Sequence, residues 1–226
     1  NSNYGKAIVG TVSGTSISYG AAVTYYDGTS SFNTATFDSN SNKVVIAYQR
    51  SSAGNCIVGT VSGTSISFGT TVQFDNSTGE MNPVFDSASN KVVVAYNKSN
   101  AGKAVVGTVS GTSISFGTAV QFNATAASLA PVFDSDSNKV VVAYYNSGNS
   151  NYGEVIVGTV SGTDISFGSA FALNNASTTQ IAATFDTNSN KVTIAYTDGG
   201  NSNYGTASVF STDGTNLTSE NYIGMS

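Results

Sequence analysis

Acidic and amide side chains alternate in a segment that occurs four times along the chain. In its third copy, "FDSDSNKVVVAY" (133–144), Asp134, Asp136 and Asn138 are spaced like the first ligands of a calcium-binding loop. The four polar stretches read DSNSN, DSASN, DSDSN and DTNSN, and no glutamate follows at the distance that such a loop requires. We therefore expect a hairpin turn in which the aspartate caps the following amides. A weak calcium site at Asp134 and Asp136 is the alternative, and no other cofactor is expected.

The inventory of catalytic side chains argues against an enzyme. The chain has no histidine, a single arginine, Arg50, and three glutamates, Glu80, Glu154 and Glu220. No base, nucleophile and orienting group occur together, and the sequence does not bring together the paired carboxylates of a glycosidase. Glu154 occupies a position at which other repeats carry lysine, asparagine or threonine. We interpret that position as solvated.

Tyrosines beside amides and hydroxyls suit the recognition of sugars instead. Aromatic faces stack on sugar rings, and amides bond to hydroxyl groups. Such residues occur in segments that differ between repeats, and these give the candidate ligand-binding residues Tyr4, Tyr25, Tyr26, Arg50, Tyr145, Tyr152 and Tyr204. Because exposed loops also vary without a function, neutral drift is the competing interpretation.

Composition excludes several classes of partner. The formal net charge of −5 and a pI near 4.4 disfavour nucleic acid, which is bound through lysine and arginine, and disfavour anionic membrane surfaces. No apolar run is long enough for a transmembrane helix. A hydrophobic content of 39% is enough for a folded core. The chain begins at Asn1 without methionine, so we expect a piece of a longer protein.

Two elements alternate along the chain. The aspartates of the first element, Asp38, Asp86, Asp134 and Asp186, are 48, 48 and 52 residues apart. The second element, "VGTVSGTSISFG" (58–69), has similar copies at 9–20, 106–117 and 157–168 and a worn copy at 208–219. This periodicity predicts a single domain over 1–226 that is built from repeats of about 48–52 residues.

Each repeat predicts four β-strands, A to D. In one repeat these are "PVFD", "KVVVAY", "AVVGTV" and "SISFGTAVQF". Strand B is apolar on both faces, which indicates a strand between two neighbouring sheets. Strand D alternates apolar and polar residues, which is typical of an outer strand with one solvent-exposed face. Four-stranded antiparallel units of this length are typical of β-propeller blades.

Four A–B pairs and five C–D pairs give four and a half blades. We expect a five-bladed propeller whose first blade is incomplete; four blades with an extra hairpin, or completion of the half blade by a second chain, are alternatives. The A–B and C–D turns should lie on one face. The more variable B–C and D–A loops should lie on the other, where a rigid frame commonly carries function.

The repeats "VGTVSGTSISFG", "FDSxSNKVVVAY" and "GNSNYG" resemble a family of phage virion and tail-fibre-like proteins and marine bacterial surface proteins. The resemblance covers nearly the whole chain and implies an extracellular or virion-surface location. It implies a non-enzymatic module that binds a surface glycan or a protein receptor through the B–C and D–A loops. A purely structural spacer or assembly module is the first alternative. A degenerate sialidase-like glycosidase is the second, because "STDGTNL" (211–217) resembles the Asp-box turn.

Overall fold

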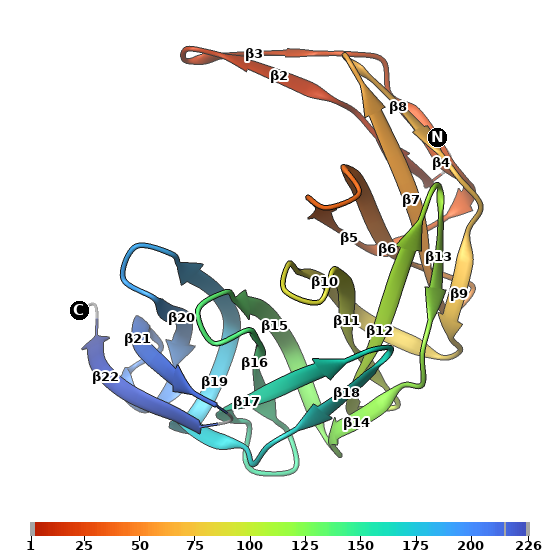
Figure 1. Cartoon of the computed structure of the whole chain (residues 1–226). Coiled ribbons are helices and arrows are strands. Elements are labelled where there is room, and N and C mark those ends of the chain that lie inside the picture. The colour runs from red at the N-terminus through yellow and green to blue at the C-terminus, as the bar shows by residue number, and fades with distance from the viewer. Residues whose placement is uncertain (1–2, 215, 225–226) are drawn as a thin grey trace.

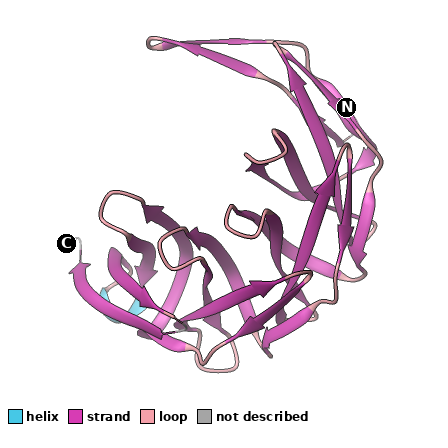
Figure 2. Ribbon diagram, viewed as in Figure 1, coloured by secondary structure: helices cyan, strands magenta, loops and turns pink. Residues whose placement is uncertain are grey.

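The chain folds into antiparallel β-sheets that follow one another around an open arc (Figure 1). The computed structural model describes residues 3–214 and 216–224. Figure 2 shows strands over most of the ribbon, joined by short loops. Within the described residues, the one helix is the three-residue 3₁₀ helix η1 (Gly199–Asn201), and no helix reaches the length and apolarity that a membrane span requires. The predicted all-β class is confirmed.

Four complete sheets make up most of the arc, each running from an inner strand through two middle strands to an outer strand. The first sheet contains β5 (Ser31–Asp38), β6 (Lys43–Arg50), β7 (Ala53–Ser62), β8 (Ser65–Phe68) and β9 (Val72–Asp75). The second contains β10 (Thr78–Asp86), β11 (Lys91–Lys98), β12 (Ala101–Ser110), β13 (Ser113–Phe116) and β14 (Val120–Asn123). The third contains β15 (Ala126–Asp134), β16 (Lys139–Asn146), β17 (Tyr152–Ser161), β18 (Asp164–Phe167) and the start of β19 (Phe171–Asp186). The fourth contains the rest of β19, β20 (Lys191–Asp198), β21 (Tyr204–Asp213) and β22 (Asn216–Gly224).

A half-sheet precedes them at the N-terminal end of the arc. In it, β1 (Tyr4–Ala7) pairs with β4 (Val23–Thr29), and β2 (Gly10–Ser13) pairs with β3 (Ser16–Tyr19). These strands correspond to predicted strands C and D, and within the described residues no A–B pair joins them. The strand order therefore matches the predicted count of four A–B pairs and five C–D pairs.

In the first three complete sheets the first middle strand joins neighbouring sheets because it is apolar on both faces. In β11, Val92, Val93, Val94, Ala95 and Tyr96 have no exposed surface. Alternate side chains point to opposite faces of a strand, so Val92, Val94 and Tyr96 pack with the first sheet while Val93 and Ala95 pack with the third. The predicted position of strand B between two sheets is confirmed.

The prediction of one continuous strand D is wrong. The segment "SISFGTAVQF" is split into β13 and β14, which both pair with β12. At the break, the amide of Gly117 donates to the carbonyl of Val106 (2.9 Å). A Cβ on Gly117 would lie only 2.0 Å from the carbonyl oxygen of Thr163 in the next sheet. The outer strand therefore breaks where the turn of the following sheet packs against it.

The turn between the inner and middle strands is stabilised by its own aspartate. The carboxylate of Asp86 accepts hydrogen bonds from the amides of Ala88 (2.9 Å) and Ser89 (3.0 Å) and from Ser89 Oγ (2.6 Å). Asn90 closes the turn with a positive φ of 55°. This pattern recurs in the other three copies, so the predicted hairpin turn is confirmed.

The calcium candidate falls within one of these turns. Asp134 is buried, and its carboxylate accepts bonds from the amides of Asp136 and Ser137 and from Ser137 Oγ, whereas the Asp136 side chain is exposed. No cluster of three or more acidic, histidine or cysteine side chains that could hold a metal ion occurs in the part of the chain that the structure describes. The Asp134 carboxylate also accepts a hydrogen bond from the hydroxyl of Thr212 in β21, so donors of the turn and of the next sheet occupy it.

Replacement of Asp86 by alanine should destabilise the protein by about 1–3 kcal/mol, because three donors lose a buried acceptor. Asp186→Ala is the matched control: the same turn position is exposed there, so a smaller loss is expected. Urea unfolding followed by circular dichroism measures both. Equal losses would contradict the role of burial.

Candidate functional site

Polar side chains meet at the outer edge of each junction between consecutive sheets. The first junction joins the half-sheet to the first sheet, and the second, third and fourth follow in chain order. Each junction combines a residue at the end of one sheet's outer strand with two residues of the next sheet's first middle strand. These two are a tyrosine and the residue two positions after it. The contributing residues are Tyr26, Tyr48 and Arg50 at the first junction, Asp75, Tyr96 and Lys98 at the second, Asn123, Tyr144 and Asn146 at the third, and Asn174, Tyr196 and Asp198 at the fourth.

The loops beside these positions are held together by backbone bonds. The amide of Thr78 donates to Ser52 (2.7 Å), and that of Ala126 donates to Asn100 (2.8 Å). Each bond links a D–A connection to the B–C turn of the preceding sheet. The predicted neighbourhood of the B–C and D–A loops is thus observed, and the junction site lies beside it.

At the second junction the charges neutralise one another. Asp75 forms an ion pair with Lys98, and it accepts a hydrogen bond from the buried hydroxyl of Tyr96 (2.7 Å). Burial alone would raise the pKa of Asp75, but the bonds from Lys98 and Tyr96 outweigh it and hold that pKa below its ordinary value. Burial and the neighbouring carboxylate raise the pKa of Tyr96.

At the third junction a carboxylate is satisfied by neutral donors. Glu154 accepts hydrogen bonds from Tyr144 Oη (2.8 Å), Asn146 Nδ2 (2.9 Å) and Asn123 Nδ2 (3.2 Å). Burial, followed by the bond to Glu154, raises the pKa of Tyr144. The interpretation of the Glu154 position as solvated is corrected: the side chain is only partly exposed, and it is bonded by Tyr144 and Asn146 of its own sheet and by Asn123 of the preceding sheet.

At the fourth junction a carboxylate is again satisfied by neutral donors. The buried carboxylate of Asp198 accepts hydrogen bonds from Asn174 Nδ2 (2.8 Å) and from the amide of Gly200 (2.8 Å). At three of the four junctions, therefore, the protein itself supplies both the charged side chain and the groups that bond to it.

The first junction differs because its cation has no acidic partner. Arg50 is exposed, lies 5.0 Å from the centre of the Tyr26 ring and makes no ion pair within the described residues. A pocket of about 370 Å³ opens beside it, lined by Arg50, Ser51, Ala53, Asn55, Thr71 and Gln73. Tyr48 lies at 0% exposure behind this group, and its hydroxyl bonds to that of Thr71 (2.7 Å).

The structure brings together three of the predicted binding residues and separates the rest. Tyr25 and Tyr26 both contact Tyr48, and Arg50 stacks over Tyr26. Tyr25 is half-buried, and its hydroxyl donates to Asn33 (2.7 Å), so it supports the site from behind.

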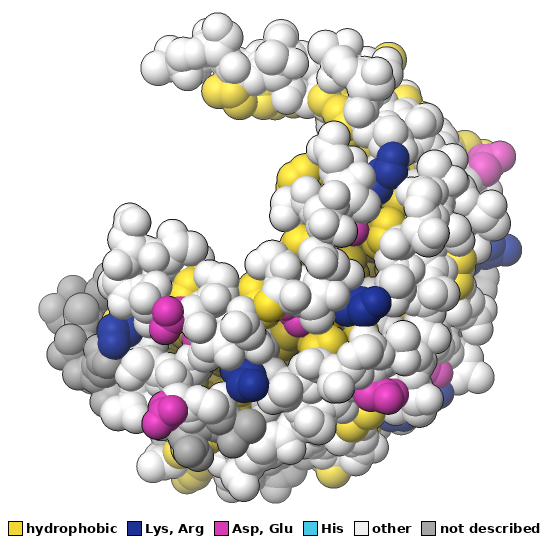
Figure 3. Space-filling model, viewed as in Figure 1, with side chains coloured by type: hydrophobic (Ala, Val, Ile, Leu, Met, Phe, Trp, Pro, Cys, Tyr) yellow, Lys and Arg dark blue, Asp and Glu magenta, His cyan; other side chains and the backbone are white. Residues whose placement is uncertain are grey.

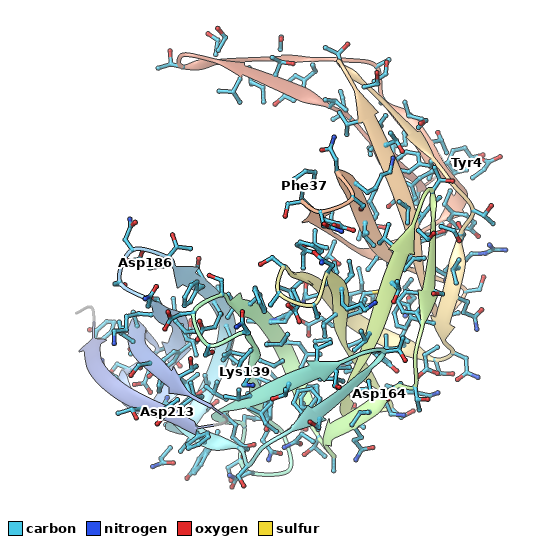
Figure 4. The ribbon with its side chains drawn as sticks, viewed as in Figure 1. Tyr4, Phe37, Lys139, Asp164, Asp186 and Asp213 are labelled. Carbon is cyan, nitrogen blue, oxygen red and sulfur yellow. The ribbon has the colours of Figure 1, made fainter. Side chains whose placement is uncertain are left out.

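The other predicted tyrosines stand on strands of other sheets. Tyr4 lies exposed on the outside of the half-sheet (Figure 4). Tyr145 and Tyr152 are half-buried in the third sheet, and Tyr204 is exposed in the fourth. None of these four tyrosines lines the pocket beside Arg50.

Sequence reasoning missed the polar lining of this pocket. Thr71 directly precedes β9 and Gln73 lies in it, and Asn55 on β7 pairs with Gln73. The exposed polar positions of the outer strand gave a signal, since Gln73 recurs as Gln121 in the next repeat. What could not be seen is that the break in the outer strand places them beside Arg50.

No protein-family model matches the chain, and no curated protein matches it. Among solved structures, the chain is similar to AofleA from Arthrobotrys oligospora, with 13% identity and a TM-score of 0.55 over 91% of this chain and 64% of that one. A variant of AofleA with three arginines replaced by alanine gives 12% identity and a TM-score of 0.56 over 97% of this chain and 74% of that one. At these identities the likeness concerns the fold alone. The chain thus spans about two thirds to three quarters of the length of these structures.

The ion pair at the second junction predicts a dependence of stability on pH. Because the pKa of Asp75 is lowered in the folded state, its contribution is present above the unfolded pKa and is lost as the pH falls through the folded pKa. Between pH 7 and pH values below about 4, the free energy of unfolding should therefore fall less in Asp75→Asn than in the wild type. Lys98→Gln should flatten the dependence too, and urea unfolding across this range measures it. Identical pH slopes in all three proteins would refute the assignment.

Proposed function

We propose that the arc is part of a β-propeller with four complete blades and one half blade. Three features support this: strand order within each sheet runs from the inside of the arc outward, consecutive sheets pack face to face, and the arc curves around an open centre (Figure 1). The chain also covers only 64–74% of two structures of similar fold. A five-bladed ring with an incomplete first blade remains our proposal for the closed form.

We propose that the chain is a non-enzymatic binding module for surface glycans that carry an acidic group. The observation on which this rests is the pocket at the first junction, where Arg50 is the one junction cation without an acidic partner among the described residues. Guanidinium groups bind carboxylates and sulfates through paired hydrogen bonds. An acidic sugar would supply the charge that Asp75 supplies to Lys98 at the second junction.

The lining of the pocket suits the rest of a sugar. Asn55, Thr71 and Gln73 provide amides and hydroxyls for ring hydroxyl groups, and Tyr26 lies beneath Arg50. The buried Tyr48 fixes the floor through its bond to Thr71. Since the supporting residues are held by strand pairing and ring contacts, binding would order few additional side chains.

Binding rather than catalysis is proposed because the residues that line the pocket include no carboxylate and no other general base. Together with the resemblance of the repeats to virion-fibre and bacterial surface proteins, this leads us to propose display outside the cell or on a virion. A variant of this proposal is that the pocket binds an acidic side chain of a protein receptor. The test below separates it from glycan binding.

The proposal predicts the behaviour of Arg50 variants on a glycan array. The wild type should bind uronic-acid, sialylated or sulfated glycans in preference to neutral ones. Arg50→Ala should lower binding by about tenfold or more, because a charge-assisted bond to the ligand is lost. Arg50→Lys should retain part of the binding, since the charge stays while the paired geometry is lost.

The double variant Tyr152→Ala/Tyr204→Ala is the matched control, because both rings stand on sheets remote from the first junction. It should bind like the wild type. Loss of binding in this control with normal binding in Arg50→Ala would move the site to the third and fourth sheets. Absence of any glycan binding by the folded wild type would overturn the glycan proposal.

A further inference from the structure

The N-terminal half-sheet leaves an apolar face uncovered. Ile8, Val12, Ile17 and Tyr19 are 50%, 72%, 50% and 63% exposed. Figure 3 shows hydrophobic side chains beneath the arm that β2 and β3 form, on the side that borders the opening of the arc. In the second and third sheets the residue equivalent to Ile17 is almost fully buried against the preceding sheet, as Ile114 and Ile165.

The inner end of the first junction is also open. Phe37 on β5 is 53% exposed and lies at the inner end of its strand (Figure 4). Its equivalents Phe85, Phe133 and Phe185 pack against the cores of the later junctions. What the first junction lacks is the A–B pair of the preceding sheet, against which Phe37 would otherwise pack.

The half-sheet also has a free strand edge. In the complete sheets, the second middle strand pairs with the first over most of its length, as β12 does with β11 from Gly107↔Val92 to Ala101↔Lys98. The equivalent segment of the half-sheet, residues 4–10, is paired only on its outer side, with β3 and β4. An unpaired edge offers backbone donors and acceptors to an incoming strand.

The direction of these backbone groups follows from one hydrogen bond. The carbonyl of Val9 accepts from the amide of Gly20 on the outer side. Backbone groups of successive residues in an antiparallel strand point to alternate edges, so the N–H and C=O of Ile8 face the free edge.

A groove runs along this edge. It has a volume of about 250 Å³. Lys6, Ala7 and Ile8 with Tyr25 of β4 line the side of the half-sheet, and residues of β5 and β6, among them Ala35 and Ile46, line the other side. The groove occupies the place where a first middle strand stands in every complete sheet. In those strands the side chains directed at the following sheet are Val45 and Ala47, Val93 and Ala95, or Val141 and Ala143.

We propose that the N-terminal half-sheet is an acceptor site for a β-hairpin of the A–B type. The incoming hairpin would add its second strand to residues 4–10 and place a Val-x-Ala pattern into the groove. This inference does not depend on the glycan site, because it uses the inner half of the junction and not the outer pocket.

A second copy of the same residues has no hairpin to spare. In each of the four A–B hairpins of the described chain, the second strand already pairs with the second middle strand of its own sheet. The occupant is therefore a hairpin from outside residues 1–226, with an apolar strand flanked by the Asp-x-x-Ser-Asn type of turn.

The direct test is binding of a labelled synthetic peptide with the sequence of residues 126–148, which holds the hairpin of β15 and β16, to the full chain. Fluorescence anisotropy should show saturable binding. Ile8→Pro in the chain should weaken it by about tenfold or more, because the N–H at the free edge is lost. Ile8→Ala, which keeps that N–H, should weaken it less. A control peptide with Val141→Asp and Ala143→Asp should not bind.

An isolated hairpin is marginally stable in water, so a second measurement uses the hairpin in the same chain. Residues 126–148 are placed ahead of Asn1, since 1–5 and 149–153 share the sequence NSNYG. Hydrogen exchange of the amides in 4–10 should slow relative to the original chain. Failure of both the peptide to bind and the fused hairpin to protect these amides overturns the proposal. A concentration-dependent dimer of the unmodified chain that protects the same amides also overturns it, in favour of a second copy.

Discussion

The structure depends on a strand that is apolar on both faces. In the first three complete sheets the first middle strand places alternate side chains against the sheet before and the sheet after it, as Val92 and Val93 do in β11. A single sheet cannot bury both sets by itself, so burial of apolar surface holds the sheets in sequence. The same arrangement explains why the two ends of the arc differ from its middle. At the N-terminal end, Ile8 and Val12 are exposed because the sheet that would cover them is missing.

Close packing of the sheets also determines the shape of the outer strand. The turn of one sheet reaches the outer strand of the sheet before it at Gly117, where a side chain would meet the Thr163 carbonyl. The strand breaks there, and its second part is placed beside the next sheet's tyrosine. The core packing and the polar junction sites are therefore consequences of one contact geometry.

The junctions show how a constant frame carries different chemistry. The tyrosine hydroxyl is retained at all four junctions, as Tyr48, Tyr96, Tyr144 and Tyr196, while the residues around it change. The second junction holds the ion pair of Asp75 and Lys98. The third holds the carboxylate of Glu154, bonded to Asn146, and the fourth holds that of Asp198, bonded to Asn174. At the remaining one, the first junction, Arg50 lies over Tyr26 and the cation faces an open pocket. A few substitutions in one repeat thus separate a structural junction from a candidate binding site, with no change in the fold.

The sequence by itself determined the all-β class, the number of repeats, the aspartate turns and the two-faced strand, because each depends on local pattern. Asp86 caps its turn with bonds to residues two and three positions away, and alternation within "KVVVAY" follows from strand geometry. The tertiary structure alone decided which side chains meet. Glu154 looked solvated, but it accepts a hydrogen bond from Asn123 across the junction. Thr71 and Gln73 join Arg50 only because the outer strand breaks. Contacts between repeats depend on how closely two sheets approach, and no spacing within one repeat encodes that distance.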